Sequence, residues 1–233
     1  MPNQPLKLTG PKAAMNATPL GDQAALLYFP DEAAAFAFAG RARSLSQPWL
    51  VDVVHAYTSV AVYFDLGQTR FAEVSRLLQP LADQPPSPTE STSTRQHVIP
   101  CCYDLGPDLT RVAQHTGLSV DEVVRLHTET EYTVYAIGFC PGFPYLGYLP
   151  SQLCGVPRLD SPRLRVEAGS VGLTGRQTGI YTEPRPGGWN LLGQTPLELV
   201  NVVDGYFPLR TGDRVRFRRV DQAEFGRLKG QRL

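Results

Sequence analysis

The sequence predicts a small α+β unit followed by a larger, mainly β unit that forms a barrel or a sandwich. Three observations support this prediction. Strand-like and helix-like segments alternate over the first part of the chain, and a stretch rich in Pro, Ser and Thr follows them. Short strand-like segments separated by Gly and Pro turns then fill most of the remainder. A length of 233 residues suffices for two such units.

The N-terminal unit is expected at residues 18–83, after a flexible leader at 1–17. Asp31 is a suitable N-cap for its first helix, because a carboxylate accepts a hydrogen bond from the first helical turn. The order strand, helix, strand, strand, helix favours a ferredoxin-like α+β unit, with His97–Cys102 as the candidate for a last strand. The expected elements are, in order, Ala24–Phe29, Asp31–Leu45, Leu50–Ala56, Ser59–Phe64 and Thr69–Leu81.

The stretch QPPSPTESTST has no large apolar side chains to bury, so a linker is expected at 84–95. The C-terminal unit is then expected at 96–221 and begins with a strand at His97–Tyr103, which competes with the assignment of this segment to the first unit. A short tail is expected at 222–233.

Two short helices are expected early in the C-terminal unit. Pro107 suits the first turn of one helix, and Ser119 with Glu122 forms the capping-box pattern at the start of the other. From Tyr132 to about Val220, strands alternate with Gly/Pro turns and no long helix fits, which is typical of a β-barrel or sandwich.

Composition argues against several classes of function. The formal net charge is zero, which gives no electrostatic basis for binding nucleic acid or an anionic membrane. The segment Val112–His127 resembles a helix-turn-helix, but Asp121 and Glu122 at the start of its second helix would repel phosphates. No apolar run is long enough to span a bilayer and no signal peptide is evident, so a cytoplasmic protein is expected. The four cysteines lack the spacing of a metal site, so no metal is expected.

Three segments rich in Gly and aromatic residues are candidates for a ligand site. They are GFCPGFPYLGYL at 138–149, AGSVGLTGRQTGIY at 168–181 and PGGWNLLG at 186–193. Glycine lets backbone approach a ligand, and the aromatic side chains supply apolar walls with polar tips. The alternative is a barrel corner whose aromatics simply fill the core. None of these segments is a phosphate-binding P-loop, since no lysine occurs between Lys12 and Lys229.

The motifs of this chain, and the order in which they occur, resemble those of the allophanate hydrolase subunit 1 family. That family includes the 5-oxoprolinase B subunit, the sporulation kinase inhibitor KipI and part of the carboxyltransferase domain of urea carboxylase. The resemblance covers nearly the whole chain, although Thr174 and Arg176 stand where the family has small residues. It rests on PLGD at 19–22, Leu26–Phe29, GPDL at 106–109, His127-Thr128, Ser161-Pro162-Arg163 and the three segments above.

The resemblance implies a cyclophilin-like β-barrel as the second domain. It also implies a larger partner, an allophanate hydrolase subunit 2-like or C-type subunit, and in the 5-oxoprolinase system a third, A-type (LamB/YcsF-like) subunit. That complex hydrolyses 5-oxo-L-proline to L-glutamate and uses ATP. We therefore expect the B-type subunit of such a complex, inactive alone, with ATP not held by this chain through a P-loop.

Motif position and residue chemistry suggest which side chains serve the site. His127 is the candidate acid/base, because an imidazole titrates near neutrality, with a structural, hydrogen-bonded histidine as the alternative. Arg163 pairs either with a substrate carboxylate or with an acid of the barrel, and Arg176 either recognises a carboxylate or points to solvent. Backbone N–H groups at 175–179 are expected to hold a carbonyl oxygen. The remaining expected substrate-binding residues are Phe143, Tyr145, Gln177, Thr178, Gly179, Tyr181 and Trp189.

The motifs do not separate three functions within the family. The first is the 5-oxoprolinase subunit. The second is a KipI-like inhibitor of a histidine kinase, and the third is a component of a urea or allophanate pathway. A barrel fold does not decide among them, since function lies in the site and not in the fold.

Overall fold

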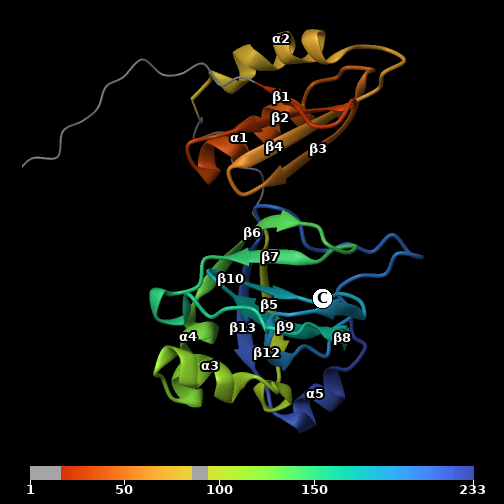
Figure 1. Cartoon of the computed structure of the whole chain (residues 1–233). Helices are drawn as coiled ribbons and strands as arrows, with labels where there is room; N and C mark the ends of the chain where they lie inside the picture. The colour runs from red at the N-terminus through yellow and green to blue at the C-terminus, as the bar shows by residue number, and fades with distance from the viewer. Residues whose placement is uncertain (1–16, 86–93) are drawn as a thin grey trace, which may run out of the picture. The chain divides into compact units, whose positions relative to one another are not determined.

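The computed structural model describes residues 17–85 and 94–233, and the chain divides into two compact units, 1–90 and 91–233 (Figure 1). Most of the expected leader at 1–17 and of the expected linker at 84–95 lies outside the described residues. No helix in the described part of the chain combines the length and the apolar composition that crossing a membrane requires.

The N-terminal unit is a four-stranded antiparallel sheet in the order β1-β2-β4-β3. Its helices α1 and α2 share one apolar core with the strands, in which Phe38 of α1 and Leu78 of α2 are fully buried. Asp31 caps α1 as predicted and accepts a hydrogen bond from the N–H of Ala34 at 2.8 Å. The elements are β1 Thr18–Pro19, β2 Ala24–Tyr28, α1 Glu32–Arg43, β3 Leu50–Ala56, β4 Ser59–Phe64 and α2 Phe71–Ala82.

The ferredoxin-like expectation for this unit is not confirmed. The strand expected to complete it, β5 (Gln96–Cys101), pairs with β13 (Arg214–Arg219) in the second unit instead. The short strand β1 pairs with β2 and occupies the edge of the sheet at which a ferredoxin-like unit would have its last strand.

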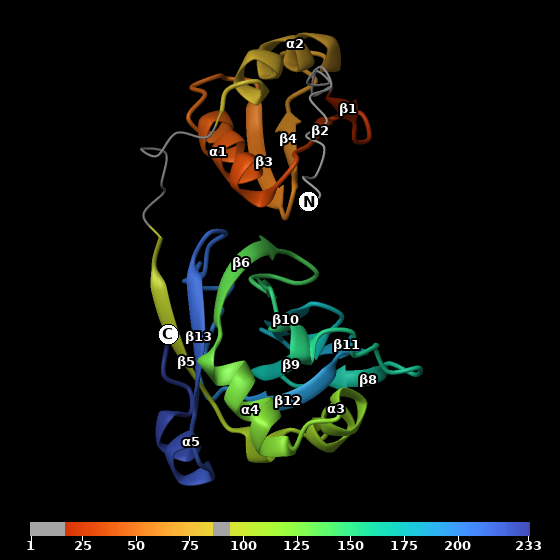
Figure 2. The same cartoon turned by 90° about the vertical axis from the view of Figure 1, so that its left-hand side faces the viewer.

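The C-terminal unit is built on a seven-stranded sheet in the order β12-β9-β10-β7-β6-β13-β5 (Figure 2). Its two edge strands meet where Cys102 and Gln194 exchange two backbone hydrogen bonds, of 2.9 and 3.1 Å. This bridge nearly closes the sheet into the expected barrel. The strands not yet given are β6 Glu131–Ile137, β7 Pro144–Gly147, β9 Ser170–Thr174, β10 Gln177–Ile180 and β12 Asn190–Gln194.

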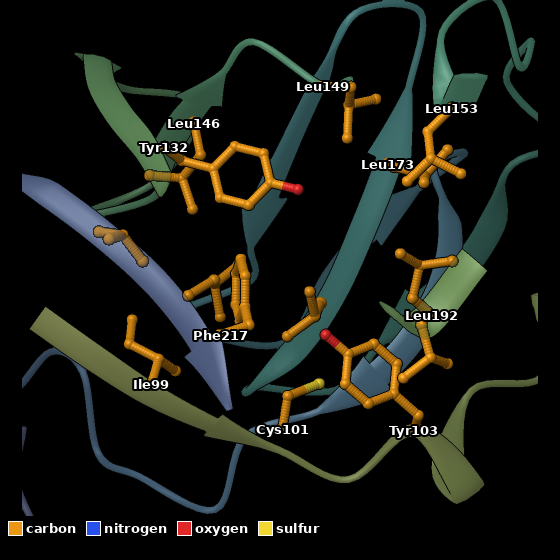
Figure 3. Packing of buried hydrophobic residues seen from close by; sticks show 14 of the residues in the cluster. Ile99, Cys101, Tyr103, Tyr132, Leu146, Leu149, Leu153, Leu173, Leu192 and Phe217 are labelled. Atoms are coloured by element: carbon orange, nitrogen blue, oxygen red, sulfur yellow. The ribbon is translucent and has the colours of Figure 1, made fainter. Parts of the chain in front are cut away.

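Closure depends on one glycine of β12. A Cβ atom on Gly193 would lie 2.7 Å from the carbonyl oxygen of Cys102 and 2.8 Å from Sγ of Cys101, which is too close for any side chain. Inside the barrel, Tyr103, Tyr132 and Phe217 pack with aliphatic side chains of the surrounding strands (Figure 3). These side chains fill the barrel, so its centre is a packed core.

Smaller elements surround the barrel. Helix α4 begins with the predicted capping box, in which Ser119 and Glu122 bond each other's backbone N–H groups. Together with α3, to which it is joined through Gly117, it contributes Val112 and Val123 to the barrel core. Residues 222–228 of the expected tail form α5. These elements are α3 Leu109–Thr116, α4 Val120–Glu129, the antiparallel pair β8 Arg163–Val166 and β11 Arg185–Gly187, and α5 Gln222–Leu228.

Candidate functional site

A pocket of about 230 Å³ opens among aromatic side chains of the C-terminal unit. It brings together residues from three separate motif segments, which is the arrangement that their Gly and aromatic content predicts for a ligand site. Four of the predicted substrate-binding residues line it. The lining residues are Phe139, Phe143, Tyr145, Arg158, Pro162, Tyr181, Pro186, Gly187, Gly188 and Trp189.

Phe143 lies at the centre of the aromatic cluster. Its ring is edge-on to the rings of Tyr145, Tyr181 and Trp189, with centroids 4.9, 5.3 and 5.5 Å away. Such edge-to-face pairs are each worth about 0.5–1.5 kcal/mol beyond burial of their area. The walls of the pocket are therefore held in place by their own packing and do not need a ligand to form.

Two glycines make room for these rings. A Cβ atom on Gly187 would lie 2.3 Å from the hydroxyl oxygen of Tyr181, and one on Gly179 would lie 2.9 Å from Cζ of Phe143 and 3.0 Å from Cζ3 of Trp189. Gly179, a predicted substrate-binding residue, does not line the pocket itself, but it leaves space for the aromatic rings that do.

Replacing Gly179 with Ala is expected to lower the free energy of unfolding by about 2 kcal/mol, because the added methyl overpacks the aromatic cluster. The same change should shift the fluorescence emission of Trp189, whose ring it contacts. Gly138→Ala is the matched control, since a Cβ there meets nothing within 4 Å. Equal stability of the two variants in urea unfolding would contradict this account of the pocket.

The hydroxyl groups of the pocket stay protonated at neutral pH. Burial raises the pKa of Tyr181 above its ordinary value, although a hydrogen bond from the Trp189 backbone and the charge of Arg158 oppose this. Burial likewise raises the pKa of Tyr145, again against the charge of Arg158. Both phenols are therefore neutral groups that can donate a hydrogen bond to a ligand.

Arg163, a predicted substrate-binding residue, pairs with Asp108 of the GPDL motif. Its Nη2 lies 2.7 Å from Oδ1 of Asp108, while Oδ2 of the same carboxylate accepts the backbone N–H of Leu191 at 2.7 Å. Asp108 is 7% exposed. Of the two alternatives for Arg163, the structure shows pairing with an acid of the barrel, and Asp108 thereby links Arg163 of β8 to Leu191 of β12.

His127, the predicted acid/base, is fully buried. Its Nδ1 lies 2.7 Å from the hydroxyl of Tyr103 and its Nε2 lies 3.0 Å from Oγ1 of Thr178. Thr178 donates its own hydroxyl proton to the carbonyl of Gly172 at 2.9 Å, so Nε2 must donate to Thr178, and Nδ1 must accept from Tyr103.

This environment does not support the acid/base assignment. Burial lowers the pKa of His127 to about 3, so the ring is neutral at physiological pH and has no free nitrogen. Phe217 stacks on it with ring centroids 4.5 Å apart. The structural alternative for His127 is the one that the geometry favours.

The other predicted residues lie on the β9–β10 hairpin, away from the pocket. Arg176 is exposed, and its guanidinium lies 4.5 Å from the centroid of Tyr148 in a cation–π contact. Thr178 belongs to the His127 network. Strand β10 pairs with both β7 and β9, so backbone N–H groups of Gln177 and its neighbours are turned toward the sheet and are not set out as a cradle for a carbonyl oxygen.

Six of the ten residues that line the pocket were not predicted as site residues, and Arg158 and Phe139 are the two of these with large side chains. Arg158 lies in an irregular segment outside every motif, and nothing local marks it. Phe139 lies within a motif, and its backbone has a φ of 69°, a conformation that only a few non-glycine residues adopt and that is often found at functional sites. Among the described residues no group of three His, Cys, Asp or Glu side chains could hold a metal ion.

Two larger hollows occur elsewhere in the described part of the chain, and of the predicted site residues only Tyr181 lines either of them. One, of about 360 Å³, lies between Tyr181 and α5 and has Lys229 on its wall. The other, of about 540 Å³, runs along the outside of α2 from Ala72 to Asp83. Neither gathers the predicted residues, so the aromatic pocket is the better candidate site.

Comparison with known proteins agrees with the motifs. The family model described as "Carboxyltransferase domain, subdomain C and D" matches residues 15–205. The chain belongs to this family. It is 35% identical over 229 residues to the B subunit of 5-oxoprolinase of Bacillus subtilis, covering 90% of this chain and 95% of that protein. It is also 36% identical to the protein of the same name from Haemophilus influenzae, over 87% and 97% of the two chains.

Solved structures share the fold of this chain. TTHA0988 superimposes with a TM-score of 0.74 at 38% identity over 86% of this chain, which spans only 40% of the TTHA0988 chain. Urea amidolyase of K. lactis superimposes on 92% of the present chain with a TM-score of 0.70 at 16% identity, and the match covers 15% of the urea amidolyase chain. The latter similarity shows a shared fold and nothing further. These findings confirm the family that the motifs indicate.

Proposed function

We propose that this chain is the B-type subunit of an ATP-dependent 5-oxoprolinase, which hydrolyses 5-oxo-L-proline to L-glutamate together with A-type and C-type subunits. The observation that carries the proposal is the alignment with the B subunit of Bacillus subtilis 5-oxoprolinase over 95% of that protein. A match of this extent leaves no large part of the relative without a counterpart here.

The pocket supports a role in binding a small substrate. Its volume of about 230 Å³ lies below the ~300–1,000 Å³ of most drug-sized ligand sites, so it suits a metabolite and is too small for ATP. ATP would then be held by another subunit, in keeping with the absence of a P-loop from the sequence.

The chemistry of the pocket supports an enzyme whose active site is shared with a partner. Amide hydrolysis needs a proton donor or acceptor that titrates near the working pH. The titratable residues that line the described pocket are Tyr145, Tyr181 and Arg158, and none of them is such a group. His127 does not line the pocket, and both of its ring nitrogens are engaged in a buried network. We infer that the C-type or A-type subunit supplies the acid/base and that this chain is inactive alone.

Co-expression with A-type and C-type subunits tests the proposal. We expect this chain to copurify with the C-type subunit, and the three-subunit mixture to release glutamate from 5-oxo-L-proline only when ATP is present. A complex that assembles but releases no glutamate would contradict the proposal and would favour the kinase-inhibitor alternative, which inhibition of histidine-kinase autophosphorylation by this chain would then establish.

A further inference from the structure

Arg158 is the cationic residue on the wall of the aromatic pocket. Within residues 17–85 and 94–233, no side chain forms a hydrogen bond or an ion pair with it. Other arginines near this end of the barrel are already neutralised by carboxylates. These pairs are Arg163 with Asp108, Arg165 with Glu167, and Arg185 with Glu183.

The backbone that carries Arg158 is fixed on both sides. The carbonyl of Val156 accepts the N–H of Gly175 at 2.8 Å, and the carbonyl of Pro157 accepts the side-chain amide of Asn190 at 2.8 Å. The N–H of Leu159 donates to Gly188 at 2.7 Å. Arg158 therefore starts from a rigid base, and a ligand that binds it does not have to order this segment.

The polar groups beside Arg158 also suit an acceptor. Tyr145 and Tyr181 line the same pocket, and the positive charge of Arg158 acts on both phenols, in the direction that lowers their pKa. Tyr181 accepts a hydrogen bond from the backbone of Trp189, so its own proton is available to donate. A guanidinium and two protonated hydroxyls are a donor set that matches a carboxylate.

The rest of the pocket is apolar. Phe139 is 59% exposed at the rim, with its ring edge-on to those of Phe143 and Tyr181 at centroid distances of 5.4 and 6.1 Å. Trp189 forms a further wall. A ligand that fills the pocket must therefore present a compact apolar face to the rings while its charged end reaches Arg158.

We propose that Arg158 is a specificity-determining residue that binds the carboxylate of a small cyclic substrate, whose ring lies against the aromatic walls of the pocket. The inference rests on the proposed function, because 5-oxo-L-proline is such a compound. It goes further in assigning the charge recognition to this chain and to a residue outside the family motifs, while the partner acts on the amide.

Binding to the isolated full chain tests the assignment. Trp189 reports on the pocket, and the Trp49→Phe background removes the other tryptophan. The probes are 5-oxo-L-proline and 2-pyrrolidinone, the same lactam without the carboxylate. We expect Arg158→Gln to weaken binding of 5-oxo-L-proline about tenfold, because a hydrogen-bonded charged group is lost. Arg158→Lys should restore part of this loss, and 2-pyrrolidinone should bind the parent protein and Arg158→Gln equally weakly.

Arg165→Gln is the control, because Arg165 is exposed, pairs with Glu167 and does not line the pocket. Equal affinity of the parent and Arg158→Gln for 5-oxo-L-proline, or no saturable response to it, would overturn the assignment.

Kinetics of the three-subunit complex separate the two proposals. A raised KM for 5-oxo-L-proline in Arg158→Gln, with kcat little changed, supports both. Glutamate release with the same KM in Arg158→Gln and in the parent overturns the role of Arg158 and leaves the proposed function standing. No glutamate release, together with titrations in which Arg158→Gln loses affinity, overturns the proposed function and leaves the carboxylate site.

Discussion

Replacing His127 with Ala is expected to lower the free energy of unfolding of the C-terminal unit by about 4 kcal/mol, since a large buried ring is removed and a cavity remains. The hydroxyl of Tyr103 also loses its acceptor inside the barrel, and an unsatisfied buried hydroxyl costs about 1–3 kcal/mol. His115→Ala on the exposed surface of α3 is the matched control and should change stability by less than about 0.5 kcal/mol.

The same histidine should make the stability of this unit depend on pH. Its pKa is about 3 in the folded chain and about 6.5 when unfolded, so between these values the unfolded chain binds one more proton than the folded chain. The free energy of unfolding therefore falls as pH decreases from about 6.5 toward 3, by about 1.4 kcal/mol per pH unit from this group. Above pH 6.5 the contribution is constant.

His127→Phe separates this effect from general acid sensitivity, because it keeps an aromatic ring of similar size but cannot titrate. We expect its urea midpoint, followed by Trp189 fluorescence, to change less with pH than that of the parent. His55 in the N-terminal unit has a pKa of about 4 for the same reason, so the probe must report on the C-terminal unit alone. Identical pH profiles for His127→Phe and the parent would show that His127 is not a buried neutral ring.

Replacing Asp108 with Ala is expected to lower the free energy of unfolding by about 3 kcal/mol, because it removes one partner of a largely buried ion pair. Arg163 would keep its charge with no acid beside it, and the N–H of Leu191 would lose its acceptor. The effect should extend to the pocket, since Leu191 and Trp189 belong to one apolar cluster.

Asp121→Ala provides the comparison for Asp108→Ala. Asp121 is 87% exposed and lies 3.3 Å from Arg219, and exposed pairs of this kind contribute about 0–1 kcal/mol. Urea unfolding of both variants measures the difference. Similar losses for the two would mean that Asp108 does not organise β8 and β12.

Local patterns in the sequence predicted local structure well. The caps at Asp31 and Ser119 form because a short polar side chain beside the first helical turn needs only its own neighbours. The aromatic residues of the Gly-rich segments also meet as predicted, because these segments form strands and turns of the barrel in which glycine allows close packing.

Local patterns did not predict the contacts between segments that lie far apart in the sequence. The pairing of β5 with β13 joins Gln96 to Arg214, far along the chain, and no local signal selects it over pairing within the first unit. The burial of His127 follows from the closure of the barrel around it, and the composition of α4 does not reveal it. Arg158 lies at the pocket because two backbone–backbone hydrogen bonds, and one from the side chain of Asn190, fix an irregular segment.

As proposed above, this chain is a required component of a 5-oxoprolinase. The most direct measurement is ATP-dependent glutamate release from 5-oxo-L-proline, with this chain titrated into fixed amounts of the A-type and C-type subunits. We expect no glutamate release without the chain, and a rate that rises with added chain and saturates when the partner is fully bound. The same rate with and without the chain would contradict this proposal.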